Sequence, residues 1–115
     1  MTSIVIIGAG GHGKVLAAAL LRANIRVHGF LDADAALTGK SILGLPVLGD
    51  DVLLNDPQNA HWRLVNGIGS IGRPARRREL FERLKERGFV FQTVVDPTSI
   101  IGPEVELCEG SQVLA

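Results

Sequence analysis

Short apolar runs alternate with helix-like segments along most of the chain, and this alternation predicts an α/β domain. Residues 4–7 are all aliphatic, as in strands that are buried on both faces of a parallel sheet. Residues 11–23 are apolar almost all round, which predicts a largely covered helix. Residues 25–31 alternate apolar with polar or small side chains and predict a second strand. Strand, helix and strand in this order predict a right-handed crossover unit.

The middle of the chain predicts shorter elements. Residues 42–48 read as a short edge strand, because Pro46 is tolerated in a sheet only at an edge. Asp50 can start a short helix over residues 50–55 by accepting a hydrogen bond at its first turn. Residues 62–68 then predict another strand of the sheet.

A second long helix is predicted between Pro74, which suits a first turn, and Gly88, which suits the position after the last turn. Charged side chains cover most of it, and four arginines lie within residues 73–78. Mixed charges at helical spacing favour a solvated surface with weak ion pairs. Arg73, directly after a glycine-rich segment, is the best candidate among them for a phosphate contact. Residues 89–95 predict the last strand of the α/β domain.

The period of the apolar positions changes to six after residue 96. The repeating positions are Ile101, Leu107 and Val113, with Val105 and Ser111 at a companion position. Hexapeptide repeats build a parallel β-helix, in which each six-residue piece forms one side of a triangular coil. We therefore expect a small Rossmann-like domain over residues 1–96, with a mainly parallel sheet flanked by helices. Residues 97–115 are expected to be the truncated start of a parallel β-helix built from hexapeptide repeats.

Glycines mark the junction between the first predicted strand and helix, in the stretch Gly8-Ala-Gly-Gly-His-Gly-Lys14. Gly8 can take the tight turn that leaves the strand, Gly10 lets the backbone approach a ligand oxygen, and Gly13 lets helix and strand pack closely. The first helical turn also offers unpaired N–H groups and the positive end of the helix dipole. The stretch therefore predicts a site for phosphate or pyrophosphate.

Two side chains near this turn have alternative interpretations. Asp32 lies about twenty residues further on, where an acid in a dinucleotide-binding fold accepts a hydrogen bond from a ribose hydroxyl. Aspartate is also common as a plain turn residue. His12 can contact a phosphate or sugar oxygen, or can instead bond a nearby backbone carbonyl. The other two histidines, His28 and His61, are expected to be structural or surface residues.

Composition excludes several classes of function. The chain has 115 residues, 46% of them hydrophobic, and twelve basic residues balance twelve acidic ones. Balanced charge argues against a nucleic-acid partner. There is neither a membrane-length apolar run nor a signal-peptide pattern, so no membrane partner is expected. The single cysteine, Cys108, cannot form an internal disulfide and is expected to be a buried small apolar residue, in keeping with a cytoplasmic protein. No metal site is predicted.

Several short motifs follow one another in a characteristic order. After the glycine stretch come Gly29-Phe-Leu-Asp32, Leu45-Pro-Val-Leu-Gly49, Gly67-Ile-Gly69, an arginine-rich helix, Gly88-Phe89 and Val95-Asp-Pro-Thr-Ser99. As an ordered set, covering essentially the whole chain, they resemble the bacterial sugar acyltransferases of the sialic acid O-acetyltransferase type. That family includes the pilin- and bacillosamine-glycosylation acetyltransferases. The resemblance implies an N-terminal domain that binds a sugar nucleotide, and a C-terminal left-handed β-helix that binds acetyl-CoA and assembles as a homotrimer.

By position, the resemblance implies contacts to a UDP-sugar or a related sugar nucleotide. With the glycines of the turn included, the predicted substrate-binding residues are Gly8, Gly10, Gly11, His12, Gly13, Asp32, Ala33 and Gly69. Asp32 and Ala33 would lie at the uridine end, although the family often has a second acid where this chain has Ala33. The general base of the family is a histidine of the β-helix. No catalytic residue is therefore assigned here, and this chain alone is expected to bind its substrate without catalysing acyl transfer.

Two other functions fit parts of the sequence. The glycine spacing and Asp32 suit the NAD(P)-binding Rossmann domain of an oxidoreductase, but such an enzyme has no place for the hexapeptide tail. A non-catalytic nucleotide-sensing module would need no more than this chain. For the acyltransferase, the implied reaction is direct attack of a sugar amine or hydroxyl on the thioester of acetyl-CoA.

Overall fold

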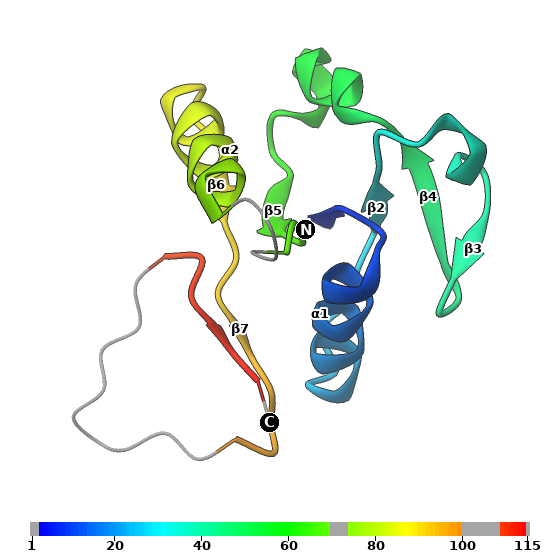
Figure 1. Ribbon diagram of the computed structural model, residues 1–115, viewed down its shortest axis with the longest axis vertical. Helices are drawn as coiled ribbons and strands as arrows, with labels where there is room; N and C mark the ends of the chain where they lie inside the picture. The colour runs from blue at the N-terminus through cyan, green and yellow to red at the C-terminus, as the bar shows by residue number, and fades with distance from the viewer. Residues whose placement is uncertain (1–2, 70–73, 100–108, 115) are drawn as a thin grey trace.

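Figure 1 shows the computed structural model, which describes residues 3–69, 74–99 and 109–114. Within these residues the strands of the main sheet are β1 (Ile4–Ile7), β2 (Gly29–Leu31), β3 (Ser41–Ile42), β4 (Leu45–Gly49), β5 (Arg63–Asn66) and β6 (Val90–Phe91). Their order across the sheet is β3-β4-β2-β1-β5-β6. All neighbouring pairs are parallel except β3 and β4. The predicted α/β class with a mainly parallel sheet is therefore confirmed.

The two long helices, α1 (Gly11–Arg22) and α2 (Pro74–Glu86), cover opposite faces of this sheet. Successive residues of a strand point to opposite faces, and the buried core divides accordingly. Ile4 and Ile6 of β1 pack with the α1 side chains, whereas Val5 and Ile7 pack with Leu84 of α2. Burial on both faces explains why the central strand is a continuous aliphatic run.

The helix ends follow the sequence signals. Asn24, just after α1, has a φ of 60°, and Gly88, just after α2, has a φ of 90°. Both are in the left-handed region that ends helices. Three short 3₁₀ helices, η1 (Ala35–Leu37), η2 (Asp51–Asn55) and η3 (Pro57–Asn59), occur in the described connections, and each begins after an aspartate whose carboxylate accepts a backbone N–H. Asp50 has this role for η2, as predicted.

Two strand predictions need correction. Residues 42–48 do not form one edge strand, because Leu43 and Gly44, with φ of 54° and 78°, reverse the chain between β3 and β4. Such a two-residue turn produces a hairpin, so β3 is the edge strand and Pro46 lies one strand further in. The strand predicted over residues 25–31 is shorter, since its pairing with β1 begins only at Gly29.

The predicted strand over residues 89–95 is divided between two sheets. Its first part is β6, whereas its second part, β7 (Val94–Val95), pairs in parallel with β8 (Gln112–Val113) in a separate two-stranded sheet. Each residue of β8 lies eighteen positions after its partner in β7. Val94 and Leu114 pack against the core beside α1, so the small sheet covers part of that helix. The repeat positions Ile101, Val105 and Leu107 lie outside the described residues, as does Cys108.

Candidate functional site

The glycine turn between β1 and α1 is fixed by close backbone contacts. Gly8 has a φ of 102°, which favours glycine, and its N–H donates to the carbonyl of Leu31 in β2 at 2.7 Å. A Cβ added to Gly13 would lie 1.9 Å from the carbonyl oxygen of Gly8. The third glycine therefore lets α1 approach the strand end, as its spacing predicted.

The first turn of α1 is open on the side away from the sheet. A Cβ added to Gly10 or Gly11 would meet no described atom within 4 Å, so packing does not require glycine at either position. Gly10 is the N-cap residue, and no side chain of the described residues caps the helix there. The first turn also contains no acidic residue. Within the described residues no carboxylate accepts the N–H groups of this first turn, so these groups and the positive end of the helix dipole remain available to an anion.

Asp32, at the end of β2, holds the neighbouring backbone in place. One carboxylate oxygen accepts the N–H of Ala9 in the glycine turn at 2.8 Å, and the other accepts the N–H of Asp34 at 2.9 Å. Asp32 therefore makes the backbone contacts of a turn residue. Because each carboxylate oxygen can accept a further hydrogen bond, the same side chain retains capacity for a ribose hydroxyl.

The end of β5 lies directly beside the glycine turn, on the other side of β1 from Asp32. Gly67 donates its N–H to Ile7 at 2.8 Å, and a Cβ on Gly67 would lie 2.6 Å from the same carbonyl oxygen. The buried amide of Asn66 accepts the N–H of Ile68 and donates to the carbonyl of Arg77. Two strand ends with close backbone contacts thus meet where the strand order reverses, which is the usual ligand position in such sheets.

Arg77 of α2 secures the end of β5 from the opposite side. Its Nη1 donates to the carbonyl of Asn66 at 3.0 Å and to that of Ile68 at 2.9 Å. Partial burial of the guanidinium lowers the pKa of Arg77 from its ordinary value. The sequence predicted a solvated surface for this group of arginines, so the role of Arg77 in bracing the strand end was missed. Arg73, the predicted phosphate contact, lies outside the described residues.

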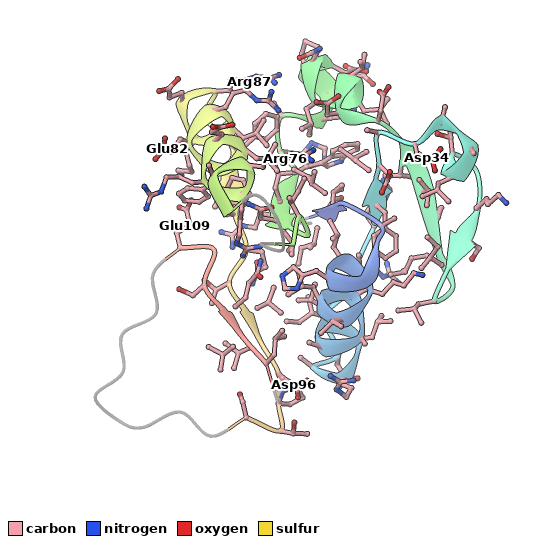
Figure 2. All side chains as sticks on the ribbon, in the orientation of Figure 1. Asp34, Arg76, Glu82, Arg87, Asp96 and Glu109 are labelled. Atoms are coloured by element: carbon pink, nitrogen blue, oxygen red, sulfur yellow. The ribbon has the colours of Figure 1, made fainter. Side chains whose placement is uncertain are left out.

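These strand ends form one wall of a cleft of about 1100 Å³. All the predicted substrate-binding residues line it except Gly13, which is buried beneath the turn. Residues of α2 form the opposite wall, among them Arg76 (Figure 2), Leu80 and Arg83. Arg83 lies 3.7 Å from Asp51 of η2 in an exposed ion pair at the cleft. A separate pocket of about 330 Å³ lies between α2 and residues 109–111, which precede β8.

His12 is the only histidine that lines this cleft among the described residues. Its Nε2 lies 2.9 Å from Oε1 of Gln112 in β8. The amide nitrogen of Gln112 in turn donates to the backbone carbonyl of Asn66 at 2.9 Å. His28 is exposed and packs near the Trp62 ring, with ring centroids 5.8 Å apart, and His61 is also exposed. The prediction that these two histidines are structural or surface residues is confirmed.

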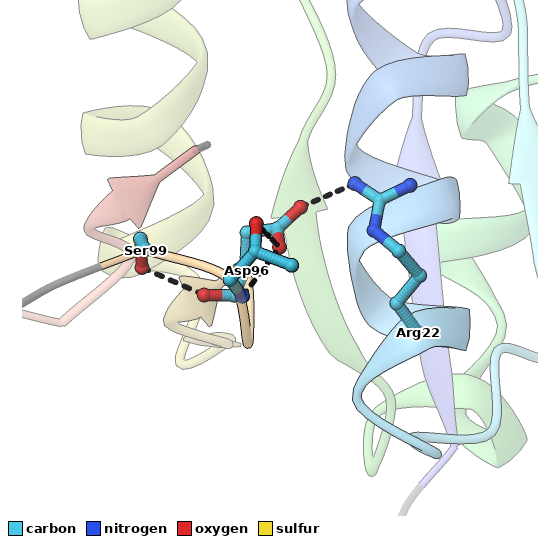
Figure 3. Close-up of polar contacts among 4 residues, drawn as sticks. Arg22, Asp96 and Ser99 are labelled. Atoms are coloured by element: carbon cyan, nitrogen blue, oxygen red, sulfur yellow. Dashed lines mark hydrogen bonds and ion pairs between the residues drawn. The ribbon is translucent and has the colours of Figure 1, made fainter.

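The far end of α1 is also tied to the tail (Figure 3). Arg22, in the last turn of α1, donates to the carboxylate of Asp96, which is only 1% exposed. Asp96 also accepts hydrogen bonds from the backbone and hydroxyl of Thr98, and its own carbonyl accepts from the Ser99 hydroxyl. The hydrogen bond from Arg22 and those from Thr98 lower the pKa of Asp96 from 3.8 to about 2.

Metal binding and membrane crossing are two further possibilities for the described part of the chain. No group of three or more histidine, cysteine, aspartate or glutamate residues there is placed to hold a metal ion. No helix in that part is long and apolar enough to cross a membrane.

A family model described as the PglD N-terminal domain matches residues 3–84. The chain belongs to this family. The curated proteins compared with it give no match. The motif order predicted a sugar acyltransferase N-terminal domain, and the family match confirms that prediction.

Solved structures of sugar acetyltransferases are similar to this chain. PerB from Caulobacter crescentus, in complex with CoA and GDP-perosamine, is 34% identical with a TM-score of 0.83, over 98% of this chain and 51% of PerB. A mutant of perosamine N-acetyltransferase from the same organism is 33% identical with a TM-score of 0.84, and the match covers 98% of this chain and 51% of that protein. The acetyltransferase domain of PglB from Neisseria gonorrhoeae, in complex with acetyl coenzyme A, is 28% identical with a TM-score of 0.80. That match covers 98% of this chain and 53% of the PglB domain. The chain thus spans about half the length of these structures.

Proposed function

We propose that this chain is the acceptor-binding domain of an acetyl-CoA-dependent sugar acyltransferase. In this proposal the cleft holds a sugar nucleotide, of the UDP-amino-sugar or sialic acid type, and positions the sugar for acyl transfer. One observation carries it above the others. The open first turn of α1 and the ends of β1, β2 and β5 line a single cleft, which is large enough for a nucleoside diphosphate and its attached sugar. The similar structures that contain GDP-perosamine support the choice of a sugar nucleotide as ligand.

The residues of the cleft suggest how such a ligand would lie. The diphosphate would accept hydrogen bonds from the N–H groups at Gly10 and Gly11, where the backbone is accessible and uncapped. The ribose would lie toward Asp32 and Ala33, and Gly69 would line the cleft near the sugar. Arg76, which the sequence did not single out, would add a positive charge from the opposite wall.

The tail supports the proposal that the domain belongs to an acyltransferase with a β-helix. In a triangular β-helix with six residues per side, one full turn takes eighteen residues, and residues eighteen apart stack as neighbours in parallel strands. β7 and β8 pair in parallel with this offset. We propose that residues 97–115 begin a left-handed β-helix, which supplies the histidine base, the acetyl-CoA site and the contacts of a homotrimer. The 115-residue chain would then bind the acceptor without catalysing transfer itself.

Positioning is the contribution that these residues make to the reaction. The transfer itself joins a sugar amine or hydroxyl to the acetyl group of acetyl-CoA. We place the reaction in the cytoplasm, because a single cysteine suits a reducing compartment. When the cleft holds the nucleotide, the attached sugar is held in a fixed position, and its reacting group lies away from the nucleotide contacts. Binding energy from the remote part of the substrate then lowers the entropic cost of bringing the nucleophile to the thioester.

Titration calorimetry of the chain with a UDP-linked amino sugar, GDP-perosamine, UDP, GDP and NAD tests the proposed ligand. We expect saturable binding of at least one sugar nucleotide and no saturable binding of NAD. The opposite result, saturable NAD binding with no response to any sugar nucleotide, would favour the oxidoreductase interpretation of the same glycine turn. A response to the nucleoside diphosphates alone, with no gain from the sugar, would favour a nucleotide-sensing module.

Substitutions in the glycine turn test its role in binding. Gly11→Val and His12→Ala are each expected to weaken sugar-nucleotide binding about tenfold or more. The thermal midpoint should change little, because the Gly11 position is open and His12 is only half-buried. Gln58→Ala, at an exposed position on η3, is the matched control and should bind as the wild type does. If both turn variants also bind as the wild type does, the turn has only a structural role.

A further inference from the structure

Gln112 connects three parts of the molecule that are distant in sequence. Its side-chain amide lies between the ring of His12 at the start of α1 and the backbone carbonyl of Asn66 at the end of β5. Both contacts are 2.9 Å long, and His12 lies 100 positions away in the sequence. Gln112 itself belongs to β8, in the small sheet outside the α/β domain. The tail therefore contributes a polar side chain to the immediate surroundings of the cleft.

The carbonyl of Asn66 determines which way this amide faces. A backbone carbonyl can only accept hydrogen bonds, and here it already accepts one from Arg77 at 3.0 Å. If the amide of Gln112 were reversed, its oxygen would face the carbonyl oxygen of Asn66 at hydrogen-bonding distance, and the two would repel each other. The NH₂ group must therefore point to Asn66, and Oε1 must point to His12.

This orientation in turn determines the tautomer of His12. Oε1 of Gln112 can only accept, so Nε2 of His12 must carry the proton and donate it. In the neutral ring the other nitrogen, Nδ1, is then an acceptor. Nδ1 makes no hydrogen bond with the rest of the described residues. His12 lines the cleft, so a ligand with an N–H or O–H donor would complete the bonding of the ring.

We propose that Gln112 is a positioning residue of the cleft, which holds neutral His12 as the Nε2–H tautomer and so presents Nδ1 as an acceptor for a hydroxyl or amine of the bound sugar. This inference rests on the proposed function for the identity of the ligand, but the tautomer is a property of the chain alone. It also changes the role expected for His12. The sequence suggested that His12 donates to a phosphate or sugar oxygen, whereas its donor nitrogen is occupied by Gln112.

The surroundings of α1 explain why a tail residue can position His12 reliably. The first turn of α1 is tied to β8 through His12 and Gln112, and its last turn is tied to the segment after β7 through Arg22 and Asp96. Val94 of β7 packs in the core beside α1 between these two contacts. Because β8 holds one end of the helix and the segment directly after β7 holds the other, the distance between β8 and the start of α1 has little freedom to change.

Long-range ¹H–¹⁵N correlation spectra of the histidine rings test the tautomer directly, because protonated and unprotonated ring nitrogens have well-separated ¹⁵N shifts. The spectra are recorded on the 115-residue chain at about pH 8.5, where an ordinary imidazole is neutral. The signals of His12 are identified from their loss in His12→Gln. We expect the proton on Nε2 in the wild type and a mixture of tautomers in Gln112→Leu. Gln58→Leu, at an exposed position on η3, is the control and should leave the His12 signals unchanged.

Gln112→Glu distinguishes positioning of the ring from a general effect on packing. One carboxylate oxygen can still accept from Nε2 of His12, so the proton on Nε2 should persist in this variant. The other oxygen cannot donate to the carbonyl of Asn66 and is repelled by it, so the anchoring of the side chain is lost. Gln112→Leu should also weaken sugar-nucleotide binding roughly three- to tenfold, the value of one hydrogen bond, and Gln112→Glu should restore part of that loss.

A proton on Nδ1 in the wild type, or unchanged tautomer populations in Gln112→Leu, would overturn the inference. Those results are independent of the calorimetry, so the role of Gln112 and the identity of the ligand can fail separately. If the predicted tautomer is found but no sugar nucleotide binds, the proposed function is wrong and the hydrogen-bond chain remains.

Discussion

Gly13→Ala is expected to lower the free energy of unfolding by about 3 kcal/mol, which is a large effect for the addition of one methyl group. The new Cβ would lie 1.9 Å from the carbonyl oxygen of Gly8 and 2.9 Å from its carbonyl carbon. Both are backbone atoms of the tight turn, so neither can rotate away as a side chain could. Relief requires α1 to move away from β1, and such a movement would separate buried side chains such as Leu16 from the sheet.

Gly11→Ala is the matched control, because it adds the same methyl group to the same helical turn. No described atom lies within 4 Å of that position. Alanine is also a better helix former than glycine, by up to about 1 kcal/mol. Urea denaturation should therefore separate the two variants, with Gly13→Ala destabilised and Gly11→Ala unchanged or slightly stabilised. Equal stabilities would mean that the close approach of α1 to the glycine turn does not exist in solution.

Asp96→Asn is expected to destabilise the chain at neutral pH but progressively less in acid. The hydrogen bond from Arg22, followed by those from Thr98, lowers the pKa of Asp96 from 3.8 to about 2 in the folded state. A lowered folded-state pKa means that the stabilisation is fully present above pH 3.8 and disappears as the pH falls through about 2. The asparagine amide would instead direct an N–H group or a neutral oxygen at the guanidinium of Arg22.

The measurement is the difference in urea midpoint between wild type and Asp96→Asn at several pH values from about 7 to about 2. Comparing the two proteins removes the titration of the other carboxylates, including Glu109, whose pKa is lowered mainly by its hydrogen bond with Lys85. Arg22→Met is the second variant, because it removes the largest cause of the shift while Asp96 remains. The difference in urea midpoint between Arg22→Met and Asp96→Asn should depend much less on pH. A difference that stays constant from neutral to acid pH would contradict an ionised Asp96 paired with Arg22.

The elements that the sequence predicted best are those whose signals are local. The aliphatic run of β1, the apolar helix α1 and the left-handed residues Asn24 and Gly88 all have their causes within a few positions of the chain. The edge hairpin was missed because Leu43 and Gly44 lack the asparagine or aspartate that usually marks such a turn. The split of residues 89–95 was missed because it depends on pairing with β8, eighteen positions later.

The candidate site divides in the same way. The glycine spacing and the distance to Asp32 predicted which backbone would line the cleft, because a strand–turn–helix junction is encoded in a short contiguous stretch. Arg77 gave no such signal, since charged side chains on a helix usually face solvent. Its partners, the carbonyls of Asn66 and Ile68, become available only when α2 packs beside the end of β5.

The sequence by itself determined the order and type of the main elements, the glycine turn, and the family to which the chain belongs. Hydrophobic period and backbone freedom are properties of neighbouring residues, so they can be recognised without a fold. Only the tertiary structure decided which nitrogen of His12 donates, because that depends on Gln112, 100 positions away, and on the carbonyl of Asn66 behind it. The protonated nitrogen of a histidine is set by the partners around its ring, and no local pattern in the sequence specifies them.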